Sequence, residues 1–172
     1  MATPLHNRIS ELRLMPTSAL LPHPQNWRRH PAQQRAVLRS LLQSVGIADA
    51  LLVYESPRYG GLTILDGHLR QAEFPRQEWP CLVLDVSDAE ADVLLATLDP
   101  LVGMAETDSA QLRGLLEQLE GQDAPLQEWL QQFAEESGAV PPAFLPSPVD
   151  EQARLDEQRK VECPECGHVF TP

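Results

Sequence analysis

A chain of 172 residues has room for one ordinary domain and a tail, and its 42% hydrophobic content is typical of a globular protein rather than a disordered one. No apolar run approaches the ~20 residues that span a bilayer, and Met1–Ser10 lacks the apolar core of a signal peptide, so a cytoplasmic protein is expected. The net charge of −12 is unevenly spread, with nine arginines against six acids in residues 1–84 and four basic residues against nineteen acids in residues 85–172.

The first part of the chain predicts a strand, a loop and a helix. Residues 11–14 alternate polar and apolar side chains, which indicates a strand. The segment from Leu20 to Pro31 holds three prolines and is expected to be an extended loop without regular structure. A helix should follow and end at Gly46, because apolar residues recur on one face with helical spacing. These residues are Val37, Leu38, Leu41, Leu42 and Val45.

The middle of the chain predicts three strands and two helices. Residues 51–54 and 62–65 are expected to be strands joined by a turn. The sequence Asp66-Gly67-His68-Leu69-Arg70 follows the second strand directly and should open a short helix that Pro75 ends. Residues 81–84 predict a buried strand, in which Cys81 is most simply a core residue. Ser87 and Glu90 have capping-box spacing, which predicts a helix over residues 88–98 that ends before Pro100.

Two amphipathic helices around residues 112–119 and 126–133, separated by Gly121 and Asp123, predict a helical hairpin. Beyond Gly138 four prolines indicate a semi-rigid linker, and the charged stretch 150–160 fits a short helix. The expected organisation is therefore a mixed α/β (α+β) domain and three following segments. Their bounds are 8–105 for the domain, 106–137 for a helical hairpin packed on it, 138–160 for the linker and 161–172 for a Cys-x-x-Cys tail.

The junction around Gly67 is the strongest candidate for a binding site. Gly67 lets the backbone turn sharply and lets a ligand approach closely, and the first N–H groups of the next helix would point at that space. Arg70 could donate two hydrogen bonds to a phosphate, and His68 could donate another or transfer a proton. The alternative is a structural turn in which Arg70 pairs with Asp66.

The order of these motifs resembles the ParB/sulfiredoxin-like domain over about residues 12–100. The matching motifs are Leu21-Pro22, Asn26-x-Arg28-Arg29, a helix and Gly46, Leu51-Leu52-Val53, Ile64-Leu65-Asp66-Gly67-His68-Leu69-Arg70 and Cys81-Leu82-Val83-Leu84-Asp85. Their form is most similar to ParB-like proteins of phages and mobile elements. The resemblance implies a small mixed sheet flanked by helices and a bound nucleotide or nucleic-acid phosphate. The residues that would hold it are Gly67, His68 and Arg70, faced by Asn26, Arg28 and Arg29.

The chain also departs from that family. Sulfiredoxins carry a catalytic cysteine where this chain has His68, so sulfiredoxin activity is not expected. Chromosome-partitioning ParB proteins carry a second nucleotide motif, Glu-Asn-x-x-Arg, where this chain has Thr97-Leu98-Asp99-Pro100-Leu101. They also carry a helix-turn-helix domain, whereas the hairpin of this chain is acidic and would repel DNA. Binding of phosphate at one site is therefore expected, and a site-specific DNA clamp is not.

Three functions follow as alternatives. The first is an accessory protein of phage or mobile-element DNA metabolism. It would bind DNA, or a nucleoside triphosphate with Mg²⁺, through its arginine-rich front half. Trp27 would then stack on a base, and the alternative is that it packs in the core. The second is a metal-dependent nuclease or phosphohydrolase with catalytic Asp66 and His68, on which Asp85 would converge. The third is an adaptor whose acidic back half binds a partner protein, although those acids could equally form a solvated surface. No membrane partner is expected.

The tail motif Cys163-x-x-Cys166-Gly167-His168 resembles one knuckle of a zinc ribbon. Cys163, Cys166 and His168 would supply three ligands, and the fourth could come from Cys81, from water or from a second chain. Two tails that met across a two-fold axis would join a homodimer through zinc. The alternative is a chain end that binds no metal.

Overall fold

The structure is a computed structural model that describes residues 4–140, 161–162, 165–166 and 168–170. The chain divides into two units, Met1–Val140 and Pro141–Pro172, and each is described by itself. Within the described ranges, none of the helices is both long enough and apolar enough to cross a membrane.

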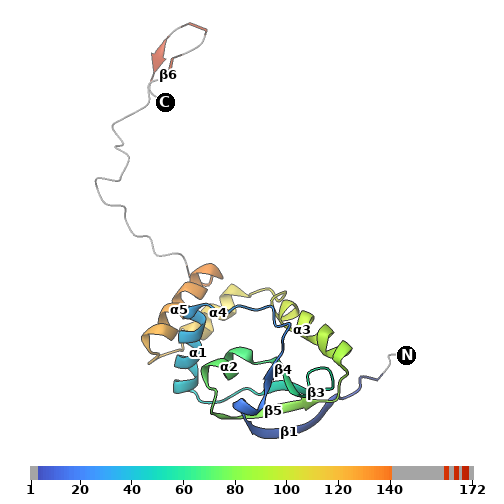
Figure 1. Cartoon of the computed structure of the whole chain (residues 1–172). Coiled ribbons are helices and arrows are strands. Elements are labelled where there is room, and N and C mark those ends of the chain that lie inside the picture. The colour runs from blue at the N-terminus through green and yellow to red at the C-terminus, as the bar shows by residue number, and fades with distance from the viewer. Residues whose placement is uncertain (1–3, 141–160, 163–164, 167, 171–172) are drawn as a thin grey trace. The chain divides into compact units, whose positions relative to one another are not determined.

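The first unit is built on one mixed sheet, which confirms the predicted α+β class (Figure 1). Its strands are β1 (Ile9–Pro16), β2 (Leu21–Pro22), β3 (Leu51–Ser56), β4 (Gly61–Asp66) and β5 (Glu78–Leu84). They lie in the order β1-β5-β3-β4-β2. The β1–β5 and β3–β4 pairs are antiparallel, whereas the β5–β3 and β4–β2 pairs are parallel.

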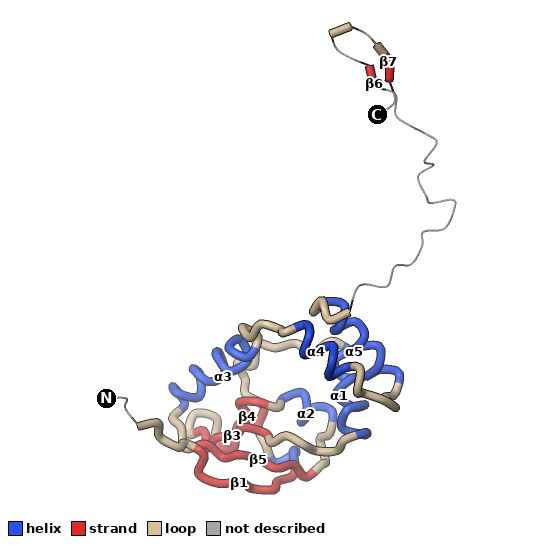
Figure 2. Tube along the Cα trace, turned by 180° about the vertical axis from the view of Figure 1, so that it is seen from behind, coloured by secondary structure: helices blue, strands red, loops and turns tan. Residues whose placement is uncertain are grey.

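Helices lie on both faces of this sheet. They are α1 (Ala32–Ser44), α2 (His68–Glu73), α3 (Asp88–Val102), α4 (Ser109–Leu116) and α5 (Ala124–Glu136), with a 3₁₀ turn at Thr17–Ala19. Figures 1 and 2 show α1, α4 and α5 together at one side of the sheet and α3 at the other. The α4–α5 pair forms the helical hairpin that the sequence predicts, and α5 packs against α1.

Side chains alternate along the strands, so the sheet has two apolar faces. On one face the core contains Val53 and Ile64, packed with Leu42 of α1 and with Phe74 at the end of α2. On the other face Tyr54 and Leu65 pack against two residues of α3, Ala91 and Leu95. The junction between β4 and α2 therefore lies between α1 and α3.

Trp79 and Cys81 belong to the first of these cores, as the sequence predicts for Cys81. Both are almost completely buried, and the indole N–H of Trp79 donates to the carbonyl oxygen of Asp49 at 2.8 Å. Burial raises the pKa of the Cys81 thiol, which favours its protonated form. The capping box of α3 is confirmed, because the Ser87 N–H donates to the Glu90 carboxylate at 2.8 Å and the Glu90 N–H donates to the Ser87 hydroxyl.

Three local expectations are wrong. Leu21 and Pro22 are not loop residues but form β2, because an edge strand tolerates a proline whose missing N–H would face solvent. α3 continues past Pro100, which lies in the last turn and removes only one intrahelical hydrogen bond there. Of the expected apolar face, Leu41 of α1 and the C-cap residue Val45 are exposed, whereas Leu42 packs against the sheet.

In the second unit, Val161–Glu162 (β6) pairs antiparallel with Val169–Phe170 (β7). Cys166 and His168 are exposed. Cys163, the linker prolines and the helix expected over 150–160 lie outside the described residues, so the zinc site and the linker stay predictions.

Candidate functional site

The backbone turns sharply between β4 and α2. Gly67 has φ +105° and ψ 15°, in the left-handed region that glycine adopts without strain. A Cβ at this position would lie 2.1 Å from Cδ2 of the buried Leu51, so any side chain here would force Leu51 to move. Since α2 has just 6 residues, under two helical turns, positive charge at this junction comes mainly from arginine side chains.

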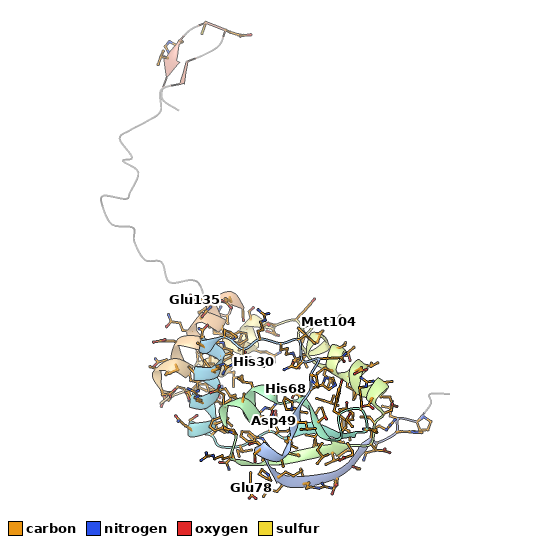
Figure 3. All side chains as sticks on the ribbon, in the orientation of Figure 1. His30, Asp49, His68, Glu78, Met104 and Glu135 are labelled. Atoms are coloured by element: carbon orange, nitrogen blue, oxygen red, sulfur yellow. The ribbon has the colours of Figure 1, made fainter. Side chains whose placement is uncertain are left out.

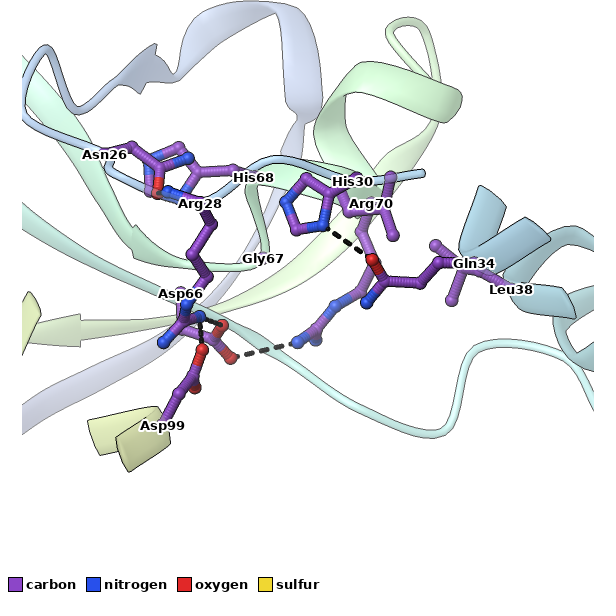
Figure 4. A pocket seen from close by; sticks show the side chains of 11 residues that line it. Asn26, Arg28, His30, Gln34, Leu38, Asp66, Gly67, His68, Arg70 and Asp99 are labelled. Carbon is purple, nitrogen blue, oxygen red and sulfur yellow. Dashed lines mark hydrogen bonds and ion pairs between the residues drawn. The ribbon is translucent and has the colours of Figure 1, made fainter. Parts of the chain in front are cut away.

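A cavity of about 250 Å³ lies over this turn (Figure 4). Four segments of the chain line it: the loop after β2, the first half of α1, the β4–α2 turn and the last turns of α3. The lining residues are Asn26, Arg28, His30, Gln34, Leu38, Asp66, Gly67, His68, Leu69, Arg70 and Asp99. The structure thus brings together most of the residues expected at a phosphate site, namely Asn26, Arg28, Gly67, His68 and Arg70.

Arg29 lines a shallow hollow beside the cavity instead. Trp27 lines the same hollow, which shares Arg28, His30 and Gln34 with the cavity. Trp27 is 58% exposed, so of its two expected positions the structure supports the exposed one. Its indole N–H donates to the carbonyl oxygen of Leu95 at 3.4 Å, and the Arg28 guanidinium lies 5.1 Å from the ring centre. These contacts fix the orientation of the indole.

Arg70 is held in place by three acceptors. Its guanidinium donates to the carbonyl oxygen of Ala50 at 2.9 Å and pairs with Asp49 at 2.8 Å and with Asp66 at 3.0 Å. Asp66 ends β4 four residues before Arg70, and the turn at Gly67 brings the two side chains together. The pairing of Arg70 with Asp66 is the structural alternative that the sequence leaves open. It also fixes the guanidinium at the cavity wall, with the side chain 15% exposed.

Arg28 reaches into the same cavity from the opposite side. It pairs with Asp99 at the end of α3 and lies 3.9 Å from the carboxylate of Asp66, as the dashed lines in Figure 4 mark. The charges therefore alternate through the site as Asp99–Arg28–Asp66–Arg70–Asp49, which we call the ion-pair chain. Both arginines of the ion-pair chain already have carboxylate partners. An anionic ligand must therefore replace these carboxylates or bind together with a cation.

His68 carries no charge at neutral pH. Burial lowers the pKa of His68 to about 4, and the nearby His23 contributes in the same direction. The Nε2 atom of His68 accepts a hydrogen bond from the backbone N–H of His23 at 3.1 Å. The ring proton must therefore be on Nδ1, and that N–H is the group that His68 can donate. His30 lines the same cavity as His68, and Figure 3 labels both residues. Nδ1 of His30 lies 3.0 Å from Oε1 of Gln34.

Asp85 does not converge on the site, contrary to the expectation for a nuclease. The register of the sheet places Leu84 beside Tyr54 of β3, whereas Asp66 at the end of β4 lies beside Leu52. The ends of β4 and β5 therefore lie on different sides of β3 and point toward its opposite ends. Throughout the described ranges, no three His, Cys, Asp or Glu residues are placed to hold a metal ion.

Sequence reasoning missed part of the cavity wall. Gln34 and Leu38 come from α1, and Asp99 comes from the end of α3. Asp99 lies in the segment 97–101, which the resemblance described above sets near the second nucleotide motif of chromosome-partitioning ParB proteins, and this was the available signal. Gln34 and Leu38 carry no such signal, because their position depends on how α1 packs.

No protein-family model and no curated protein matches the sequence. One similar solved structure is that of the C-terminally truncated chromosome-partitioning protein ParB from Caulobacter crescentus, complexed with CTP-gamma-S. The match has a TM-score of 0.49 and 19% sequence identity, and it covers 63% of this chain and 64% of that one, which is less than two thirds of its length. This neighbour belongs to the class that the order of motifs resembles.

Proposed function

We propose that this protein binds a nucleoside triphosphate, with the phosphates in the cavity over Gly67. The observation that carries the proposal is the convergence of Arg28 and Arg70 on that cavity from separate parts of the chain. Both side chains are mostly buried, at 22% and 15% exposure, and both are held by fixed partners. A ligand that uses these donors does not have to order them, which favours binding.

The ligand would replace carboxylates along the ion-pair chain. A triphosphate carries more negative charge and more acceptor oxygens than one carboxylate, so it competes well for the two guanidinium groups. The released carboxylates of Asp66 and Asp99 would then face phosphate oxygens. Mg²⁺ favours such a set of carboxylate and phosphate oxygens with water, and these two residues are therefore the candidates to hold it.

Other lining residues would complete the phosphate site. The Nδ1–H of His68 is a neutral donor, and Gly67 leaves the backbone open to close approach. The Asn26 side chain accepts from the Arg28 N–H at 3.3 Å through its oxygen, which leaves the amide hydrogens for a ligand. The shallow hollow next to the cavity would take the nucleoside, with Trp27 offering a ring face and Arg29 a positive charge.

Thermal unfolding with the four ribonucleoside triphosphates, each with and without Mg²⁺, tests the proposal. A ligand at ~100 times its dissociation constant adds about 2.7 kcal/mol to the free energy of unfolding, a shift of several degrees for a domain of this size. Arg28→Ala should abolish the shift. The matched control is Arg58→Ala, because Arg58 also pairs with an aspartate of α3, Asp92, but does not line the cavity.

Two results would contradict the proposal. One is the absence of a shift with every triphosphate, and the other is an equal shift in the wild type and in Arg28→Ala. Loss of the shift in both variants would show that the arginines act through stability rather than through the ligand.

The remaining functions stay predictions. For hydrolysis, Asp66→Asn should keep binding and stop turnover, but Asp66 and His68 are both engaged in contacts that hold the site together. Binding of DNA, a role in phage or mobile-element DNA metabolism and an adaptor role for the acidic back half are not supported by a separate observation. The nucleotide proposal therefore comes first.

A further inference from the structure

β1 is the outermost strand on one side of the sheet (Figure 2). It pairs with β5, and within residues 4–140 no other strand runs along its second edge. With 8 residues it is longer than the other strands of this sheet, and its side chains are exposed along almost its whole length. The backbone N–H and C=O groups on such an edge can pair with another strand.

Two leucines of β1 lie on a bare part of the sheet. The register with β5 places Leu12 opposite Leu82 and Leu14 opposite Pro80, so both leucines lie on the face that α3 covers farther along. α3 packs over β3 and β4 and leaves Leu12 and Leu14 exposed at 67% and 63%. No described element covers them.

The apolar surface continues from β1 toward α3 as a groove of about 520 Å³. Aliphatic side chains dominate its lining, among them Ile9, Leu84 and Val93. Its two charged residues, Arg8 and Glu90, pair with each other at 2.8 Å at the rim. A continuous apolar surface with a paired, polar rim is typical of an interface with another protein.

The sequence around Leu12 is complementary to itself. Glu11 and Arg13 flank Leu12 and pair with each other within the chain. If a second copy of β1 runs antiparallel with Leu12 opposite Leu12, Glu11 of each copy faces Arg13 of the other, and Leu14 lies diagonally next to Leu12. A shift that places Arg13 opposite Arg13 would bring like charges together, which is unfavourable in a sheet.

The ends of β1 limit this pairing. The ladder with β5 is irregular between Ile9 and Glu11, and Pro16 ends the strand. Bulges and prolines are features that protect the edges of sheets. Between them lies a regular stretch from Glu11 to Met15, and this stretch contains both charges and both leucines.

We propose that β1 joins two copies of this chain, paired antiparallel with the two-fold axis at Leu12. The two sheets then form one continuous sheet of ten strands, and the exposed leucines of the two copies pack against one another across the new strand pair. The charges of Glu11 and Arg13 set the register. This interface does not involve the cavity over Gly67.

Sedimentation velocity of the full chain from ~1 to ~100 µM tests the interface, since this range detects dimers of micromolar affinity. The wild type should sediment with twice the mass of one chain. Glu11→Arg and Arg13→Glu should each be monomeric, because each places like charges across the axis. The double variant restores complementary pairs and should dimerise. Mixing the two single variants should give a mixed dimer, because each supplies the charge that the other lacks.

Leu12→Ser is a second variant that should be monomeric. Because Leu12 is exposed, the variant should keep the fold, and circular dichroism checks this. Arg76→Glu is the matched control, since Arg76 is an exposed arginine for which the described residues provide no ion pair, and it should remain dimeric. A monomeric wild type at all concentrations would overturn the proposal. So would single charge variants that stay dimeric, or a double variant that stays monomeric.

Discussion

Gly67 is the residue on which the geometry of the site depends most directly. Its left-handed backbone and the 2.1 Å approach of a Cβ to Leu51 are separate obstacles to any side chain. The backbone term costs about 1–2 kcal/mol. Overpacking of a filled core adds roughly 1–3 kcal/mol. Gly67→Ala should therefore lower the free energy of unfolding by more than the backbone term alone, as measured by urea denaturation.

Gly60→Ala is the matched control for this prediction. Gly60 has φ +76°, but nothing lies within 4 Å of a Cβ there. The substitution should cost only the backbone term, about 1–2 kcal/mol. Equal losses in the two variants would mean that the Leu51 side chain moves aside without cost.

His68 predicts a pH dependence of stability. Burial lowers its pKa to about 4 in the folded chain, and the unfolded chain has a histidine pKa near 6.5. Below pH 6.5 the unfolded state therefore binds a proton that the folded state does not, so stability falls from pH 6.5 toward pH 4. His23, whose pKa is also lowered by burial, acts in the same direction.

The comparison that isolates His68 is wild type against His68→Gln, in which the amide oxygen can still accept from the His23 N–H. Melting temperatures between pH 7.5 and pH 5 should fall less in the variant than in the wild type. Identical slopes would assign the pH dependence to other groups, such as His23.

Among single residues, the sequence predicted those that line the cavity because of local chain geometry. Gly67, His68 and Arg70 are adjacent in the chain, and a glycine after a strand is a local signal. The partners that occupy the arginines were harder to predict. Asp66 was predicted as a partner because it is a carboxylate close to Arg70 in the chain, but the pairing of Arg28 with Asp99 depends on where α3 ends.

Among the elements, the contact between α1 and α5 includes an aspartate with two functions. Asp123 caps α5 by accepting from the Leu126 N–H, and it also accepts from the hydroxyl of the buried Ser40 in α1. Asp108 caps α4 through local contacts alone. Loss of a cap costs about 1 kcal/mol. An unsatisfied buried hydroxyl costs about 1–3 kcal/mol more. Asp123→Ala should therefore be more destabilising than Asp108→Ala in chemical denaturation, and the reverse order would contradict this account.

Elements with a strong pattern of their own were predicted correctly. The capping box defines the start of α3, and apolar runs define β3, β4 and β5. β2 was missed because a two-residue strand with a proline depends on β4 as its neighbour. Leu41 and Val45 follow the helical apolar pattern yet are exposed, whereas Leu42 of the same pattern packs against the sheet.

Across the whole molecule, the uneven charge distribution serves partly to attach α3. Arg8, Arg58 and Arg28 come from the basic front half, and each pairs with an acid of α3. The acids are Glu90, Asp92 and Asp99. The sequence predicted an anion site from the excess of arginine, but it could not show that acids of the same chain already occupy several of these arginines. Whether such an acid assists or competes with a ligand is therefore a question about the folded molecule.

Asp99→Asn distinguishes the two cases. Without Mg²⁺, Asp99 competes with phosphate for Arg28, so the substitution should raise the affinity for the triphosphate. A partly exposed ion pair contributes ~0.2–1 kcal/mol, which corresponds to a gain of up to about fivefold in affinity. With Mg²⁺ the gain should shrink or reverse, because the variant loses a carboxylate that can hold the cation. Isothermal titration calorimetry measures both conditions.

Asp92→Asn is the control, since Asp92 lies on the same helix but pairs with Arg58 outside the cavity. The affinity of this variant for the triphosphate should not change. An unchanged affinity in Asp99→Asn under both conditions would mean that the phosphates do not reach Arg28.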